Sequence, residues 1–220
     1  MTLLKLCGTT NREDALLAGR AGADFCGILV DVDWSERSLS LEQARQVAEA
    51  SGVRNVILLC NPRAAFARAV AGTLRPYALQ LHCQEPPSLV ADLKKTLNCA
   101  IWKTVHLPNL AGQAAPQAYE AAGADALLAD TVDTSEGFAR LGGTGKVGDW
   151  EAVATLMQEV SIPVFLAGGI GPDNIAAAVG TVQPDGIDLC SGVESARGRR
   201  DPVKVERLMQ TFRKAAGAKG

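Results

Sequence analysis

The chain has 220 residues, 47% of them hydrophobic and 21% charged, which is typical of a globular domain with one large core. Its net charge is −2 and no basic run stands out, so neither composition nor charge favours a nucleic-acid partner. No apolar run approaches the ~20 residues of a membrane helix, and the chain turns polar at Asn11, so we expect no membrane span and no signal peptide.

Short apolar runs alternate with longer amphipathic stretches along the whole chain. The runs predicted to be strands are 3–7, 24–30, 54–60, 78–81, 99–104, 125–129, 164–167 and 186–189. The stretches predicted to be helices lie near 11–20, 40–51, 62–72, 86–97, 112–122, 149–159, 172–180 and 201–215. Apolar strands that alternate with helices indicate a parallel sheet covered by helices, and eight such pairs in this length close naturally into a barrel.

We therefore predict an α/β fold, a (β/α)8 TIM barrel that forms a single domain over residues 1–220. A doubly wound open sheet is the alternative, but no G-x-G-x-x-G motif follows the first predicted strand. A short repeat, Ala-Gly-Ala-Asp, ends at Asp24 and again at Asp125 and marks the start of two of the strands. Glycine ends a helix well because it accepts a positive φ.

Chemically capable side chains and glycine pairs collect at or just beyond the carboxyl ends of the predicted strands. They are Cys7, Arg37, His82, Lys103, Asp130, Gly168, Gly169 and Ser191. In such barrels this end is the catalytic face. The clustering therefore predicts an enzyme.

Glycine-bearing loops follow the last three predicted strands and predict a phosphate site. Glycine lets the backbone approach an anion, backbone N–H groups can donate to it, and a lysine adds positive charge. The residues assigned to this site are Gly143, Thr144, Gly145, Lys146, Gly168, Gly169, Ser191 and Gly192. Val147 follows the lysine, so the P-loop pattern is not satisfied and ATP is not the expected ligand. We expect a small-molecule sugar phosphate.

Six cysteines are present, with no C-x-x-C spacing among them: Cys7, Cys26, Cys60, Cys83, Cys99 and Cys190. Several lie in apolar runs, where a thiol packs as a small hydrophobic group. For a chain of this length we expect reduced thiols in a cytoplasmic protein rather than a disulfide framework.

Motifs spread over nearly the whole chain match one known family. They occupy residues 5–10, 13–15, 38–40, 79–82, 130–131, 142–146, 149–150, 166–169, 186–194 and 201–202. With them the chain resembles the phosphoribosylanthranilate isomerases of tryptophan biosynthesis. Related phosphate-binding barrels share the late glycines of this set but not the opening Cys-Gly pair.

The resemblance implies an aldose–ketose isomerase, which is an intramolecular oxidoreductase. It would convert N-(5'-phosphoribosyl)anthranilate into 1-(2-carboxyphenylamino)-1-deoxyribulose 5-phosphate by an Amadori rearrangement, with no metal and no organic cofactor. Cys7 would be the base and Asp130 the acid. Arg37 would face the anthranilate carboxylate, which its fork geometry suits, and Asp188 would lie near the substrate's amino group. His82 is expected to line the pocket.

Several positions depart from the family's pattern, namely Thr9, Cys83, Val147, Gly148, Cys190 and the acids of the loop before Arg37. Asp31, Asp33 and Glu36 would oppose a carboxylate at Arg37 unless another group neutralises them. Two alternatives stay open: a paralogue that isomerises a different phosphoribosyl amine, and a non-catalytic sugar-phosphate sensor on the same barrel. Retention of the cysteine and the aspartate argues against the sensor, since binding alone needs neither. The sequence ranks no helix face as an oligomer interface.

Overall fold

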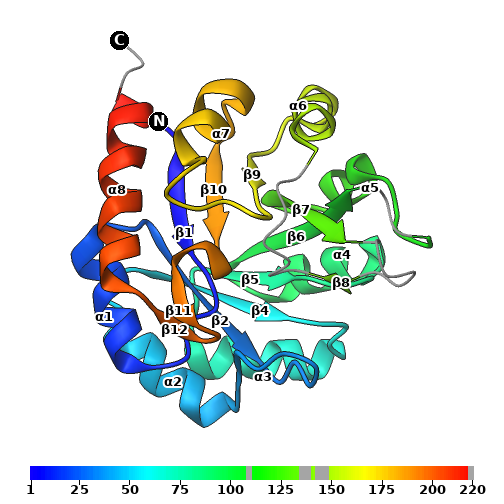
Figure 1. The fold of residues 1–220 in the computed structure, drawn as a ribbon. Helices are drawn as coiled ribbons and strands as arrows, with labels where there is room; N and C mark the ends of the chain where they lie inside the picture. The colour runs from blue at the N-terminus through cyan, green and yellow to red at the C-terminus, as the bar shows by residue number, and fades with distance from the viewer. Residues whose placement is uncertain (108–110, 134–139, 142–148, 218–220) are drawn as a thin grey trace.

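The computed structural model describes residues 1–107, 111–133, 140–141 and 149–217. Within these ranges, parallel strands form a closed barrel that helices surround (Figure 1). The barrel strands are β1 (Leu3–Leu6), β2 (Phe25–Val30), β4 (Arg54–Leu59), β5 (Ala78–Leu81), β6 (Ala100–Leu107), β7 (Ala126–Asp133), β9 (Val164–Leu166) and β10 (Gly186–Leu189). They pair side by side in this order, and β10 pairs with β1 to close the ring. The predicted (β/α)8 barrel is confirmed.

A helix follows each barrel strand on the outside of the ring. The helices are α1 (Arg12–Ala21), α2 (Leu41–Ala50), α3 (Ala64–Leu74), α4 (Pro87–Thr96), α5 (Pro116–Ala121), α6 (Trp150–Glu159), α7 (Ile175–Val182) and α8 (Pro202–Gly217). α5 is shorter than predicted and begins at Pro116, a residue favoured in the first helical turn. α7 also begins late, because Asn174 closes a turn by accepting a hydrogen bond from the N–H of Gly171 at 2.8 Å.

Short elements that the sequence analysis did not predict decorate the barrel. β3 (Ser38–Leu39) pairs with β2, and β8 (Arg140–Leu141) pairs with β7. A 3-10 helix, η1 (Ser191–Val193), follows β10 and leads into a hairpin of β11 (Glu194–Ala196) and β12 (Arg199–Arg200). These pieces lie beyond the carboxyl ends of barrel strands, and several of them contribute to the site described below.

Aspartates tie neighbouring strands together at the amino-terminal end of the barrel. A carboxylate oxygen of Asp24 accepts a hydrogen bond from the N–H of Leu4 at 2.8 Å, and Asp125 makes the same bond to Ile101 at 2.7 Å. Asp185 repeats the arrangement just before β10, with a bond of 2.9 Å to β9. Asp24 and Asp125, the two aspartates of the sequence repeat, therefore have the same structural role. Each joins the start of one strand to the strand before it in the ring.

Aromatic rings fill the inside of the barrel near this end. The centroid of the Trp102 ring lies 5.0 Å from that of Phe25 and 4.7 Å from that of Phe165. Gly186 is the register partner of Phe165, and a Cβ at Gly186 would lie 2.2 Å from the Phe165 ring. The rings close the amino-terminal end of the barrel as a packed core, so a ligand must enter from the carboxyl end.

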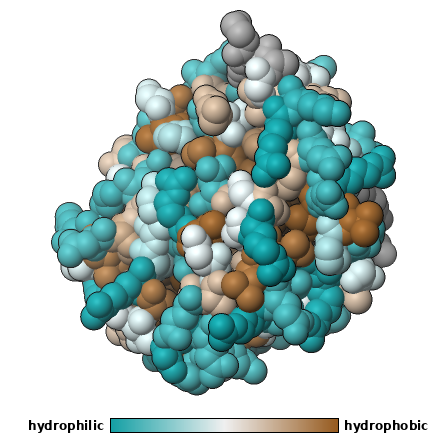
Figure 2. All heavy atoms as spheres, turned by 90° about the vertical axis from the view of Figure 1, so that its left-hand side faces the viewer, coloured by the Kyte–Doolittle hydropathy of each residue, from teal (hydrophilic) through white to brown (hydrophobic). Residues whose placement is uncertain are grey.

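The outer surface on the side of α8 and α1 carries hydrophilic side chains interspersed with smaller hydrophobic areas (Figure 2). Among the described residues, no helix combines the length and the apolar character that crossing a membrane requires.

We expect Gly186→Ala to lower the free energy of unfolding by about 1–3 kcal/mol, the usual cost of overpacking a filled core. Gly180→Ala is the matched control, because a Cβ at Gly180 meets nothing within 4 Å. Gly180 lies inside α7, so alanine there should stabilise the chain by roughly 0.5–1 kcal/mol. Urea unfolding of the two variants measures both effects. Equal stabilities would contradict the packing of Phe165 over Gly186.

Candidate active site

A pocket opens at the carboxyl ends of the barrel strands. Of the predicted site residues, it brings together Cys7, Arg37, His82, Asp130, Gly168, Gly169, Asp188, Ser191 and Gly192. The other predicted phosphate residues, Gly143, Thr144, Gly145 and Lys146, lie outside the described residues. The pocket also has lining residues that the sequence analysis did not assign, among them Leu29, Trp34, Leu58, Gln80 and Ile170.

Cys7 directly follows β1 and faces the pocket beside a buried ion pair. Lys5 on β1 and Asp188 on β10 are register partners, and the Lys5 Nζ atom lies 2.9 Å from both carboxylate oxygens of Asp188. The neighbouring strand makes room for them at Gly27, where a Cβ would lie 2.8 Å from Cys7 Sγ and 3.0 Å from Lys5 Cε. Any side chain at this position would displace the Cys7 thiol or the end of the Lys5 side chain.

The ion pair sets the electrostatics of the thiol. Burial raises the pKa of Cys7, the Lys5 cation opposes that rise, and the Asp188 carboxylate adds to it. Burial alone would lower the pKa of Lys5, but the charges of Asp188 and Cys7 raise it above its ordinary value. Lys5 therefore stays protonated and is the cation available to stabilise a Cys7 thiolate.

Asp130 reaches the same pocket from β7 and is 6% exposed. In the ring of strands, β9 and β10 separate β7 from β1, so Asp130 and Cys7 enter the pocket from different parts of its wall. A proton donor and a proton acceptor placed in this way can act on different atoms of one bound molecule.

His82 follows β5 and presents a fixed, neutral ring to the pocket. Its Nδ1 atom lies 3.2 Å from Thr104 Oγ1, and that hydroxyl accepts a hydrogen bond from Gln80 at 3.0 Å. The His106 ring meets it edge-on at 5.3 Å, and His106 Nε2 lies 2.8 Å from the backbone oxygen of His82. Burial lowers the pKa of His82 well below its usual range, with the charges of His106 and Lys103 adding to the effect. The sequence analysis assigned no role to His106.

Arg37 is held by an acid from the other end of the chain. Its Nε and Nη2 atoms donate to the two carboxylate oxygens of Glu194 on β11, at 2.7 and 2.5 Å. The sequence analysis expected the acids of the loop before Arg37 to oppose a carboxylate there unless another group neutralises them. Glu36 pairs with Arg197, and the remaining loop acids, Asp31 and Asp33, are exposed.

Two glycine-bearing loops meet at the edge of the pocket. Gly168 and Gly169 follow β9 with φ angles of 92° and 63°, in the left-handed region that favours glycine. Gly192 packs directly on this loop, because a Cβ at Gly192 would lie only 2.0 Å from the backbone oxygen of Ile170. Asn174 Nδ2 donates to the Gly169 oxygen at 2.9 Å and fixes the turn. The loops after β9 and β10 thus form one backbone surface at the pocket.

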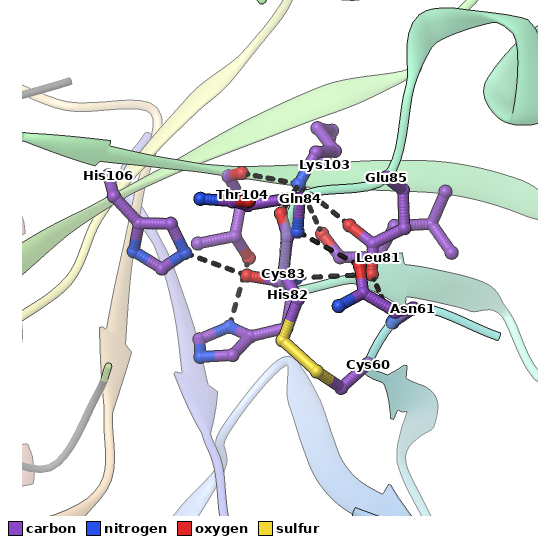
Figure 3. Close-up of a disulfide and its surroundings, with 10 residues drawn as sticks. All are labelled: Cys60, Asn61, Leu81, His82, Cys83, Gln84, Glu85, Lys103, Thr104 and His106. Carbon is purple, nitrogen blue, oxygen red and sulfur yellow. Dashed lines mark hydrogen bonds and ion pairs between the residues drawn. A yellow bond between two sulfur atoms is a disulfide. The ribbon is translucent and has the colours of Figure 1, made fainter. Parts of the chain in front are cut away.

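A disulfide joins Cys60, after β4, to Cys83, after β5 (Figure 3). The expectation that all cysteines are reduced was therefore wrong for this pair, while Cys7, Cys26, Cys99 and Cys190 are free. The two cysteines are separated by 23 positions along the chain. They meet because β4 and β5 are adjacent and parallel, which brings their carboxyl ends together.

A buried ion pair supports the same loop from its other side (Figure 3). Lys103 Nζ lies 2.9 Å from Glu85 Oε2 and donates to the backbone oxygen of Cys83 at 2.6 Å. Glu85 Oε1 in turn accepts from the N–H of Asn61 at 2.8 Å. The assignment of Lys103 to the catalytic face was wrong. Lys103 lies in the middle of β6, and because side chains alternate along a strand, it points away from the barrel interior that Trp102 occupies.

The closed barrel and its pocket, with a cysteine, an aspartate and glycine loops at the carboxyl ends of the strands, define a (β/α)8-barrel enzyme. Residues 4–211 match the model of the family described as N-(5'phosphoribosyl)anthranilate (PRA) isomerase. The chain belongs to this family, as the sequence motifs indicated.

Individual relatives agree with the family model. The chain is 35% identical to the N-(5'-phosphoribosyl)anthranilate isomerase of Methanocella arvoryzae, over 97% of this chain and 99% of that protein. It is 36% identical to the enzyme of the same name from Rhodopseudomonas palustris, over 96% of this chain and 95% of the relative.

Solved structures of the family are similar to the whole barrel. The phosphoribosyl anthranilate isomerase of Thermus thermophilus matches with a TM-score of 0.81 and 29% identity, over 97% of this chain and 99% of that one. A phosphoribosyl anthranilate isomerase in complex with reduced 1-(o-carboxyphenylamino)-1-deoxyribulose 5-phosphate matches with a TM-score of 0.77 and 26% identity, over 97% and 100% of the two chains.

We expect substitution of Lys5 and substitution of Asp188 to shift the pKa of Cys7 in opposite directions. Lys5→Met removes the stabilising cation and leaves the Asp188 carboxylate, so the pKa should rise. Asp188→Asn leaves the cation unopposed, so the pKa should fall. The pH dependence of Cys7 alkylation by iodoacetamide, followed by peptide mass spectrometry, measures both, with circular dichroism as the check that each variant folds. Shifts of the same sign would contradict the assigned role of the pair.

We expect the disulfide to stabilise the chain by about 3 kcal/mol, because it closes a loop of moderate length in the unfolded state. Dithiothreitol should lower the free energy of unfolding of the wild type by this amount. It should leave a Cys60→Ser/Cys83→Ser double variant unchanged. Cys99→Ser, which removes a free thiol, should stay as sensitive to the reductant as the wild type. A wild type that does not respond to dithiothreitol would contradict the disulfide.

Proposed function

We propose that this chain catalyses the Amadori rearrangement of N-(5'-phosphoribosyl)anthranilate to 1-(2-carboxyphenylamino)-1-deoxyribulose 5-phosphate. The observation that carries the proposal is the single pocket that holds Cys7 and Asp130 beside two glycine-bearing loops. Membership of the isomerase family supports it. So does the similarity to an isomerase bound to a reduced form of this product.

Two proton transfers open the sugar ring and form the enolamine intermediate. Asp130 gives its proton to the furanose ring oxygen, the bond between C1 and that oxygen breaks, and the nitrogen lone pair forms a Schiff base with C1. The Cys7 thiolate then takes the C2 proton. The electrons of that C–H bond form the C1–C2 double bond of an enolamine, and the electrons of the C1–N double bond return to the nitrogen. The enolamine tautomerises to the ketone as its C2 hydroxyl loses a proton and C1 gains one. Lys5 favours the thiolate that starts the second step. Neither transfer needs a metal or an organic cofactor.

The remaining predicted residues are assigned to the substrate's two ends and its nitrogen. Gly168, Gly169, Ser191 and Gly192 would donate backbone N–H groups to the phosphate. Glu194 engages Arg37 through Nε and Nη2, so we assign the Nη1 edge of the guanidinium to the anthranilate carboxylate. Asp188 would lie near the amino nitrogen. We further propose that residues 1–220 act as one domain, and that the reaction takes place in the cytoplasm.

We expect Cys7→Ser and Asp130→Asn to fold normally and to lose turnover of phosphoribosylanthranilate. One general acid or base contributes typically 10²–10⁴-fold, and a hydroxyl is far less acidic than a thiol. Cys99→Ser is the matched control, because this free thiol does not line the active-site pocket. Steady-state kinetics and complementation of a tryptophan auxotroph measure the outcome. A Cys7→Ser enzyme within ~10-fold of the wild type would overturn the base assignment.

The altered-substrate alternative has one observation in its favour, namely that Glu194 neutralises Arg37. Its test compares phosphoribosylanthranilate with the phosphoribosyl derivative of aniline, which lacks the carboxylate. If Arg37 binds the carboxylate, kcat/KM should be at least tenfold higher for the anthranilate compound, and Arg37→Ala should abolish the difference. Equal values in the wild type would instead favour a different phosphoribosyl amine as the natural substrate.

A further inference from the structure

Trp34 is a large aromatic side chain left half exposed at the mouth of the pocket. It is 55% exposed and lines the same pocket as Cys7 and Asp130. What distinguishes Trp34 from other exposed apolar residues is its place at the pocket, where a ligand that enters would cover part of its large aromatic surface. Nothing in the acid–base chemistry proposed above uses this residue.

The loop that carries Trp34 is fixed at both of its ends. The N–H of Val32 donates to Ser38 Oγ at 2.7 Å, and the N–H of Ser35 donates to the Val32 oxygen at 3.0 Å. Further along, Arg37 is clamped by Glu194. These hydrogen bonds and this ion pair hold the loop in place, and with it the indole at the pocket.

A second ring lies beside the indole. The rings of Trp34 and His82 are within 30° of parallel, with centroids 6.4 Å apart. His82 is itself held in place by Thr104 and by the edge of His106. Its neutral state makes it an uncharged aromatic surface. The two rings thus border the pocket with similarly oriented faces, one rigidly buried and one exposed.

We propose that Trp34, together with His82, binds the aromatic ring of the substrate and sets the preference for an arylamine over other amines. This rests on the proposed function. An anthranilate group carries its carboxylate on the benzene ring, next to the carbon that bears the amino nitrogen, so the groups that bind the ring and the carboxylate must lie close together. Trp34 and Arg37 lie three positions apart on one loop and both line the pocket. The apolar side chains of Leu29 and Leu58 line it as well.

The test uses two ligands that share the sugar phosphate and differ in the ring. One is reduced 1-(o-carboxyphenylamino)-1-deoxyribulose 5-phosphate, and the other is ribulose 5-phosphate. Trp34→Ala should weaken binding of the first about tenfold or more in titration calorimetry, since aromatic contact and buried area are both lost. Its binding of ribulose 5-phosphate should not change. Trp34→Phe should recover most of the loss.

Tyr77→Ala is the matched control, because Tyr77 is also half exposed, at 44%, but precedes β5 at the opposite end of the barrel. It should alter neither affinity. A Trp34→Ala variant that weakens both ligands equally, or neither, overturns the assignment. Failure of the proposed function has a different signature, namely a wild type that does not turn over phosphoribosylanthranilate, whatever the ratio of the two affinities.

Discussion

The ion pair between Lys5 and Asp188 is the interaction on which the rest of the site depends. It lies at the seam where β10 closes the barrel against β1, with the Lys5 side chain fully buried and the Asp188 side chain 10% exposed. Removing one partner of such a pair leaves a buried charge uncompensated, which typically costs about 3–5 kcal/mol. The pairing of β10 with β1 that closes the ring therefore also places the Lys5 charge that lowers the pKa of Cys7. Gly27, by carrying no side chain, leaves the space that the side chains of Cys7 and Lys5 occupy.

Around this centre, the segments that follow the strands are joined to one another. The Cys60–Cys83 disulfide links the ends of β4 and β5, and the Lys103–Glu85 pair supports the same corner from outside the barrel. Arg37 and Glu194 link the segments after β2 and η1. In each case the partners come from different strand–helix units. The pocket is thus bordered by cross-linked loops, which is how a catalytic arrangement is kept within a narrow range of positions.

Much of this could be predicted from the sequence, because alternating apolar runs determine strands and helices locally. Cys7 also falls directly after a strand whose end can be read from periodicity, whereas β7 runs on past Asp130 to Asp133. Pairings across the ring could not be read in this way. Glu194 lies 157 positions from Arg37, and no local pattern connects them. The direction of the Lys103 side chain could not be read in this way either. Alternation places Lys103 on the opposite face from Trp102 and Thr104, but which face lies inside the ring is set by the packing of Trp102 against Phe25 and Phe165.

The pairing of β1 also has a consequence for the order in which the molecule can become active. β1 pairs along its whole length with β10, whereas only Lys5 and Leu6 are in register with β2. A ribosome makes the chain from its amino-terminal side, so β1 emerges well before its main partner β10, which starts only at Gly186. During synthesis, the Lys5 ammonium group must stay in water until Asp188 has been added. A nascent chain therefore cannot assemble the environment of Cys7 until the ribosome has made β10.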